Sequence, residues 1–287
     1  MSGQPLIVNA ALTGMVPTKE LNPATPVTPE EIAADSARVC AAGASILHLH
    51  ARDEEGRPTY RRDVYAKIVS KVREHCPDAI VCVSTSGRVF KTFEERSEVL
   101  DLDGDLKPDM ASLTLGSLNF PTQASINDAE MIGRLAQRMK ERGITPELEI
   151  FDLGMVDYLK YLIGRGVLEP PFYANVLLGS LGTLSATPLH LATVVNELPP
   201  GTTWAATGIG RFQFPIHALA VAMGGNVRVG LEDNLWLDDE KMRPASNLVL
   251  VERVTAVAAA VEREIASPAE ARALIGLPAP VAGAAIS

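Results

Sequence analysis

Short apolar runs alternate with segments of helical periodicity along almost all of this 287-residue chain. Residues 6–11 form an apolar run typical of a buried strand. Thr28-Pro-Glu-Glu31 follows, in which a capping threonine, an early proline and two acids mark the start of a helix. The alternation recurs and predicts eight units of a strand followed by a helix. The expected strands are 6–11, 45–50, 80–85, 110–115, 147–151, 172–178, 203–207 and 227–231. The expected helices begin at 28 and then span 62–75, 92–102, 127–142, 155–165, 188–197, 214–223 and 246–264, and a last short helix spans 268–275.

Helices between successive strands act as crossovers, so the strands are expected to be parallel. Eight such units in a chain of this length predict an α/β fold, a (β/α)8 TIM barrel. The alternative is an open, doubly wound sheet, but no glycine-rich dinucleotide fingerprint follows the first expected strand. Because no linker or break in composition occurs, we expect residues 1–287 to form a single (β/α)8 barrel domain. Residues 268–275 would add a short C-terminal helical extension.

Composition and charge exclude several classes of partner. The net charge of −9, without a basic cluster, argues against nucleic acid. No apolar stretch approaches the length that spans a membrane, and no signal peptide is expected. Cys40, Cys76 and Cys82 lack CxxC spacing and are expected to be reduced thiols in the cytoplasm. The apolar stretch 254–261 could pack on the barrel or on a neighbour, and we expect a homo-oligomer.

Polar residues at the ends of the expected strands are the candidates for chemistry, because barrel active sites gather there. The clearest pattern is His48-Leu-His50, at the end of the second expected strand. Alternate residues of a strand point to the same side, so both imidazoles project together and can reach one cation. The alternative is a pair of histidines satisfied by hydrogen bonds. We favour a metal site because the two histidines share this spacing.

Glu232 and Asp233 follow the last expected strand directly. They either begin a solvated, helix-capping loop, or Glu232 completes the metal site. The second and eighth strands have the same parity and contribute to the same layer of a barrel interior. Two histidines and one carboxylate are a common catalytic zinc set with one open position, and they also suit non-haem iron. Asp233 would then be free to act as a base.

Arg228 lies four residues before Glu232, on the same side of the expected strand. A buried arginine requires an anion. It either forms an ion pair with Glu147 or Glu149, or donates to a substrate carboxylate or a developing oxyanion. Gly230 is expected to leave room for the neighbouring side chains or for substrate.

The positions of the lysines and of the remaining histidines exclude further classes of reaction. None of the lysines falls at a strand end, so a Schiff-base aldolase is not expected. His75, His190 and His217 fall in expected helices and are interpreted as structural or surface residues. A single metal ion without a lysine nucleophile favours polarisation of a carbonyl and formation of an enolate. The expected chemistry is therefore carbon–carbon cleavage, condensation or enolisation.

Several long motifs, in order along the chain, resemble those of the β-keto acid cleavage enzymes. The motifs lie at 10–14, 46–50, 84–85, 110–120, 146–149, 154–155, 208–211, 228–234 and 245–247. The resemblance implies a zinc-dependent (β/α)8 enzyme with acetyl-CoA as co-substrate. Such enzymes convert a β-keto acid and acetyl-CoA into acetoacetate and a new acyl-CoA.

The resemblance also implies roles for individual residues. It puts zinc on His48, His50 and Glu232, and it makes Asp233 the base and Arg228 the residue that holds and polarises the reactants. The substrate-contacting positions it implies are Ser84, Ser112 and Glu149, of which we count Glu149 as catalytic; Thr114, on the same expected strand as Ser112, joins the substrate-binding set.

Two positions depart from the typical family member, which cleaves an amino-substituted keto acid. Val16 stands where that member has an acid, so a cationic substrate is not expected here. Arg88 stands where a small residue is usual. It either meets a second substrate carboxylate, which would favour a dicarboxylic keto acid, or it is a solvated loop residue. Both positions are counted as substrate-binding.

Two other functions stay open at this point. One is a divalent-metal aldolase or lyase that cleaves a keto acid without CoA. The other is an inert barrel whose metal is structural, although structural zinc sites usually have four protein ligands and only three are found here.

Overall fold

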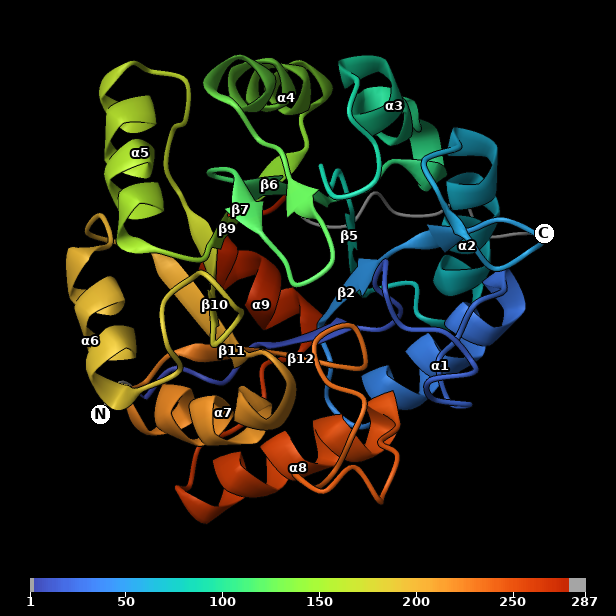
Figure 1. The fold of residues 1–287 in the computed structure, drawn as a ribbon, viewed down its shortest axis with the longest axis vertical. Coiled ribbons are helices and arrows are strands. Elements are labelled where there is room, and N and C mark those ends of the chain that lie inside the picture. Colours follow the sequence, from blue (N-terminus) through green and yellow to red (C-terminus); the bar gives the residue numbers. More distant parts are fainter. Residues whose placement is uncertain (1–2, 279–287) are drawn as a thin grey trace.

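The computed structural model describes residues 3–278, and its centre is a closed barrel of eight parallel strands (Figure 1). The barrel closes because the last strand pairs with the first, with Val8 opposite Val227. An open sheet would leave two unpaired edges, so the predicted (β/α)8 barrel is confirmed and the doubly wound alternative is wrong. The barrel strands are β1 (Val8–Ala11), β2 (Ile46–Leu49), β5 (Ile80–Val83), β6 (Met110–Thr114), β9 (Thr145–Ile150), β10 (Tyr173–Leu178), β11 (Thr203–Gly208) and β12 (Asn226–Val229).

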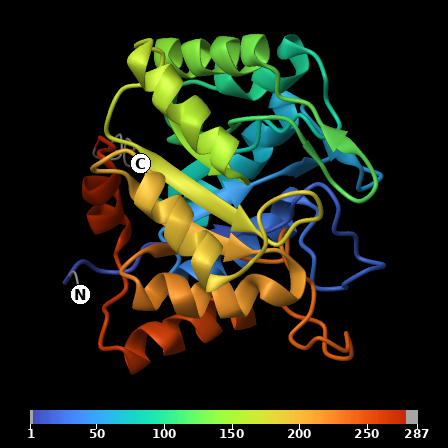
Figure 2. The same ribbon diagram turned by 60° about the vertical axis from the view of Figure 1, so that its left-hand side comes forward.

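Helices follow the barrel strands and surround them on the outside (Figures 1 and 2). Their starts obey the capping rules on which the sequence prediction rests. Thr28 caps the first helix through the Glu31 N–H, and the Glu31 carboxylate accepts in return from the Thr28 N–H. The helices are α1 (Pro29–Ala41), α2 (Arg62–His75), α3 (Phe93–Ser97), α4 (Ala129–Arg142), α5 (Leu153–Gly164), α6 (Pro188–Glu197), α7 (Gln213–Ala222), α8 (Asn247–Ala260) and α9 (Pro268–Ile275).

Helix α9 closes the end of the barrel at which the strands begin. Its Ala271 and Ile275 belong to a buried cluster that also contains residues at the starts of strands, such as Ile46, Ile80 and Tyr173. Figure 2 shows α9 at one end of the barrel and the small hairpin β7 (Leu118–Asn119) and β8 (Ala124–Ser125) beyond the other. The opposite end, where the strands finish, is therefore left for a site.

Two expected helices are shorter in the structure. The segment expected at 92–102 divides into α3 and a 3-10 turn, Glu98–Asp101, which buries Val99 and Leu100. Helix α8 ends at Ala260 rather than at 264 because residues 264–266 pair with the chain before β1. There, the Leu6 N–H donates to the Glu264 carbonyl and the Ala266 N–H to the Leu6 carbonyl.

The outer helices include none long and apolar enough to cross a membrane within residues 3–278. In α8, Val254 and Ala258 are buried within this single chain. These two residues of the apolar stretch pack on its own barrel, whereas Val261 is 39% exposed, and a homo-oligomer stays a prediction.

Gly230 lies close to the first strand instead of leaving room for substrate. It has a φ of +155°, and a Cβ there would lie 2.1 Å from the Ala11 carbonyl oxygen. The expectation of free space at this position is therefore wrong. The glycine is needed because β1 and the loop after β12 pass too close together for a side chain.

Candidate active site

A cavity of about 320 Å³ opens where the barrel strands end. Most of the residues expected at the site line it, although they come from distant parts of the chain. These residues are Val16, His50, Ser84, Arg88, Thr114, Glu149, Arg228, Glu232 and Asp233. Ser112 does not line this cavity, and its Oγ accepts a hydrogen bond from the Thr85 N–H (3.1 Å). Its substrate contact stays a prediction.

His50 and Glu232 line the cavity, and His48, which is buried and does not line it, lies next to both of them. The two Nε2 atoms lie 3.3 Å apart, and Glu232 Oε1 lies 3.2 Å from Nε2 of His50. Glu232 Oε2 lies 3.7 Å from Nε2 of His48. One donor atom from each residue lies within 4.8 Å of the others, which is compatible with binding of one metal ion.

The donor atoms of this group fit a divalent cation such as zinc. Nitrogen ligands about 2.0–2.1 Å from a tetrahedral ion lie roughly 3.4 Å apart, close to the distance between the two Nε2 atoms. A hydrogen bond between the rings would give a similar distance. Even with that bond, Glu232 Oε2 would stay unsatisfied, because it is buried and has no hydrogen-bond partner within residues 3–278. A cation would satisfy this oxygen as well as both rings.

The electrostatics of the cluster favour the ligand forms of His50 and Glu232. Burial lowers the pKa of His50 more than the Glu232 carboxylate raises it, so the ring is held neutral. Burial alone would raise the pKa of Glu232, but His50 and Arg228 together hold it well below its usual range. A neutral imidazole and an ionised carboxylate are the forms that bind metals.

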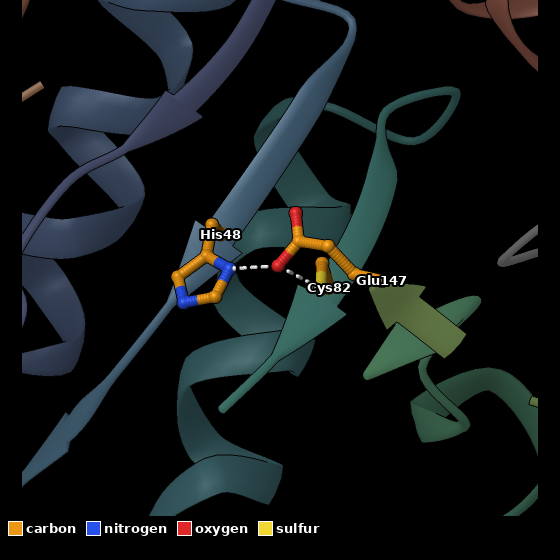
Figure 3. A group of neighbouring side chains, drawn as sticks. All are labelled: His48, Cys82 and Glu147. Atoms are coloured by element: carbon orange, nitrogen blue, oxygen red, sulfur yellow. Dashed lines mark hydrogen bonds and ion pairs between the residues drawn. The ribbon is translucent and has the colours of Figure 1, made fainter. Parts of the chain in front are cut away.

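Below the cavity, Glu147 on β9 orients the His48 ring (Figure 3). Its Oε2 lies 2.7 Å from Nδ1 of His48, and its Oε1 accepts from Asn9 Nδ2 (2.6 Å) and Asn175 Nδ2 (2.8 Å). An N–H at Nδ1 leaves Nε2 as the lone-pair nitrogen that faces the cluster. Sequence reasoning suggests Glu147 only as a partner of Arg228 and misses this role. The one signal for it is an acid at alternate spacing from Glu149 on the same strand.

His48, Cys82 and Glu147 form a second group whose donor atoms lie close enough for one metal ion (Figure 3). Hydrogen bonds already account for it: the Cys82 thiol donates to Glu147 Oε2 at 3.4 Å. Burial also raises the pKa of Cys82 well above its usual value, which disfavours the thiolate that binds metals. This group is therefore better explained as the support of His48.

We expect Glu147→Gln to weaken metal binding by about 10–100-fold, the usual effect of removing the partner of a ligating histidine. The amide oxygen cannot accept from both asparagines and His48 as the carboxylate does. Titration with zinc against a chromophoric chelator measures the affinity.

Glu149→Gln is the matched control, because Glu149 is a buried acid on the same strand that contacts Arg228 and Thr114 instead. Its zinc affinity should stay within about threefold of the parent. Equal losses in the two variants would contradict a specific role for Glu147.

Arg228 joins the acids of the cavity into one network. Its guanidinium contacts Glu149 at 3.2 Å, Glu232 at 2.8 Å and Asp233 at 3.0 Å, with Glu147 at 3.8 Å. Burial would lower the pKa of Arg228, but these carboxylates raise it well above its usual value. The ion pairs considered from the sequence are thus present. The same cation faces the cavity, where it can also meet a substrate anion.

Asp233 is one of two cavity carboxylates, with Glu149, whose pKa is raised by burial. Burial and then the nearby Glu232 raise the pKa of Asp233, and Arg228 lowers it only in part. The Arg228 Nε–H donates to its Oδ2 at 3.0 Å, which holds the carboxylate in place. A raised pKa makes a carboxylate a stronger base.

His217 lies behind this network, a place that its helical position in the sequence does not suggest. It is buried on α7, and its Nε2 lies 2.7 Å from the Arg228 carbonyl oxygen. Burial lowers the pKa of His217 to about 4, so it is a neutral structural residue that supports β12.

The barrel and its lining together define a (β/α)8 enzyme with a candidate metal site and buried carboxylates at the ends of the strands. A family model described as beta-keto acid cleavage enzyme matches residues 5–277. The chain belongs to the β-keto acid cleavage enzyme family.

Individual relatives bear names that specify different keto acids. The chain is 41% identical over 273 residues to the 3-keto-5-aminohexanoate cleavage enzyme of Fusobacterium nucleatum, covering 95% of this chain and 98% of that protein. It is 37% identical over 278 residues to the 3-oxoadipate:acetyl-CoA acetyltransferase of Cupriavidus necator, covering 96% of each. Among solved structures, apo ObcA matches with a TM-score of 0.78 over 89% of this chain and 66% of that chain, at 23% identity. This last likeness shows the fold alone.

Proposed function

We propose that this chain is a zinc-dependent enzyme that condenses a β-keto acid with acetyl-CoA, giving acetoacetate and a new acyl-CoA. The observation that carries the proposal is the position of Asp233 beside His50 and Glu232 in one cavity, with Arg228 between the two acids. The names of the relatives support acetyl-CoA as the co-substrate.

His48, His50 and Glu232 would hold the ion, with zinc as the first candidate and another divalent metal as the alternative. Three protein ligands leave a position open for substrate, unlike the four of a structural site. A bound divalent ion would polarise the keto group and stabilise negative charge on its oxygen.

Asp233 would remove a proton from C2 of the keto acid, between the carboxylate and the keto group. Acetoacetate contains the acetyl group joined to the C1–C2 unit, so C2 must attack the thioester carbonyl and expel the CoA thiolate. The thiolate then attacks C3, and the C2–C3 bond breaks to give the acyl-CoA. Asp233 returns its proton to C2 of acetoacetate, which completes the balance.

The remaining cavity residues would bind and orient the reactants. Arg228 and Glu149 keep Asp233 in a fixed charge network, and we include both among the catalytic residues. Ser84 and Thr114 line the cavity and can donate to carboxylate or carbonyl oxygens.

We also propose that residues 1–287 form one barrel domain with α9 as its extension. We further propose that the protein is a homo-oligomer in the cytoplasm. The free cysteines support a reducing location.

The test is acetoacetate formation by the zinc-loaded protein from acetyl-CoA and a panel of β-keto acids with apolar, cationic or carboxylate ends. We expect product with one class, in amounts equal to the acyl-CoA formed. Cleavage of a keto acid without acetyl-CoA would favour the lyase. No turnover of any substrate by protein that holds zinc would favour the inert barrel.

A further inference from the structure

Arg88 is a cation in the cavity wall that has no carboxylate partner among residues 3–278. Arg88 follows β5, and its guanidinium lies 3.9 Å from the centre of the Phe120 ring. Phe120 belongs to the β7–β8 hairpin, so this hairpin holds the guanidinium in position. Within residues 3–278, no carboxylate lies within ion-pair distance of it, and its Nε is buried without an acceptor.

Arg96 and Arg52, two buried arginines near this end of the barrel, also have no carboxylate partner within residues 3–278, but their guanidinium groups donate to oxygens of the protein. The guanidinium of Arg96 donates to the Thr85 carbonyl and to Asn127 Oδ1 at 2.8 and 2.7 Å. The guanidinium of Arg52 donates to the carbonyls of Gly14 and Pro17 at 2.7 and 2.9 Å. The Arg88 guanidinium, by contrast, donates to no protein oxygen within residues 3–278, so all of its N–H groups are available to a ligand in the cavity.

The acids of the same cavity are already engaged, so they do not offer a separate site for an ammonium group on the substrate. Glu149, Glu232 and Asp233 all contact Arg228. Val16, at the cavity rim, is 46% exposed and has no charge. An ammonium on the substrate would meet an arginine and an apolar side chain, whereas a carboxylate would pair with the guanidinium.

We propose that Arg88, stacked on Phe120, binds a second carboxylate at the far end of the β-keto acid, so that the substrate is a dicarboxylic β-keto acid. The inference rests on the proposed function and narrows its substrate class. In the reaction, the C2–C3 bond breaks and the acyl group from C3 onward passes to the CoA sulfur with its distal carboxylate intact. The C1–C2 unit leaves as part of acetoacetate. Another reaction must therefore consume the dicarboxylic acyl-CoA ester that this one forms. If the enzyme works in the reverse direction, another reaction must supply that ester.

The test compares 3-oxoadipate with 3-oxohexanoate, which have six carbons each and differ in the terminal group. We expect the zinc-loaded enzyme to favour 3-oxoadipate by about 100-fold in kcat/KM, because the Arg88 guanidinium pairs with the distal carboxylate and has no such bond to the methyl end of the analogue. Arg88→Met should remove most of this preference by lowering activity on 3-oxoadipate while changing activity on 3-oxohexanoate less than about threefold.

Arg211→Met is the matched control. Arg211 also stacks on a phenylalanine, Phe212 at 4.9 Å, but it does not line the cavity. It should leave the preference unchanged. Equal losses on both substrates in Arg88→Met would overturn the proposal, since Arg88 would then bind the C1 carboxylate or the CoA. A preference of the parent enzyme for 3-oxohexanoate would overturn it too.

Calorimetric binding of the same two acids to the zinc-loaded protein separates this proposal from the proposed function. Tighter binding of 3-oxoadipate that Arg88→Met abolishes would support the subsite even if no acetoacetate formed. Equal binding of the two acids by the parent protein would overturn the subsite whatever the turnover.

Discussion

Asp233→Asn is expected to lower kcat for acetoacetate formation by about 10³-fold while the protein still folds and binds metal. The amide keeps the volume of the side chain, and its oxygen can still accept from Arg228 Nε. It cannot take a proton from carbon. Because the reaction needs a base at C2 before any bond to the thioester can form, the loss should appear in kcat more than in substrate binding.

Metal content and thermal unfolding of this variant provide its controls, and both should match the parent. Exchange of the C2 hydrogens of the keto acid with deuterated water, in the absence of acetyl-CoA, isolates the step assigned to Asp233. The variant should lose this exchange along with turnover. Unaltered turnover would rule out Asp233 as the base and would favour the inert barrel or a different base.

His50→Ala should lower bound metal from about one ion per chain to a small fraction, and activity should fall by about 10³-fold or more. His50 contacts Glu232 and His48 through its ring, so its removal takes away one of the three proposed ligands and leaves the contact between Glu147 and His48 in place. Metal content is measured by elemental analysis after dialysis against a weak chelator.

Two matched variants sharpen this experiment. His75→Ala removes an exposed histidine at the end of α2 and should keep full metal content and activity. Cys82→Ala removes a donor atom of the second group and should also keep the metal. Retention of metal in His50→Ala together with its loss in Cys82→Ala would place the ion on His48, Cys82 and Glu147 instead.

Much of the site follows from rules that act over short stretches of sequence. Strand alternation puts His48 and His50 on one side, and barrel closure places β12 and β2 on either side of β1, one strand apart. Glu232 therefore reaches His50 although 182 positions separate them. Periodicity and capping signals are likewise local, which is why the cap at Thr28 and the eight repeats can be predicted from the order of residues alone.

Other contacts depend on how the strands are staggered around the barrel. Glu147 lies under His48, and Asn9 and Asn175 reach it from opposite sides, because the stagger places these residues in one layer. No spacing in the sequence encodes that layer. The same is true of Ser112, which faces the Thr85 N–H, and of Gly230, which faces the Ala11 carbonyl.

The sequence by itself determined the eightfold repeat, the barrel and the set of side chains at the strand ends, because these depend on periodicities that each segment carries alone. The tertiary structure decided which acid supports His48 and which acids Arg228 joins. It also placed Arg88 on Phe120 with no carboxylate partner in the described part of the chain. Those outcomes arise where loops and strands distant in sequence meet. Their distances are set by packing of the whole barrel rather than by any local preference.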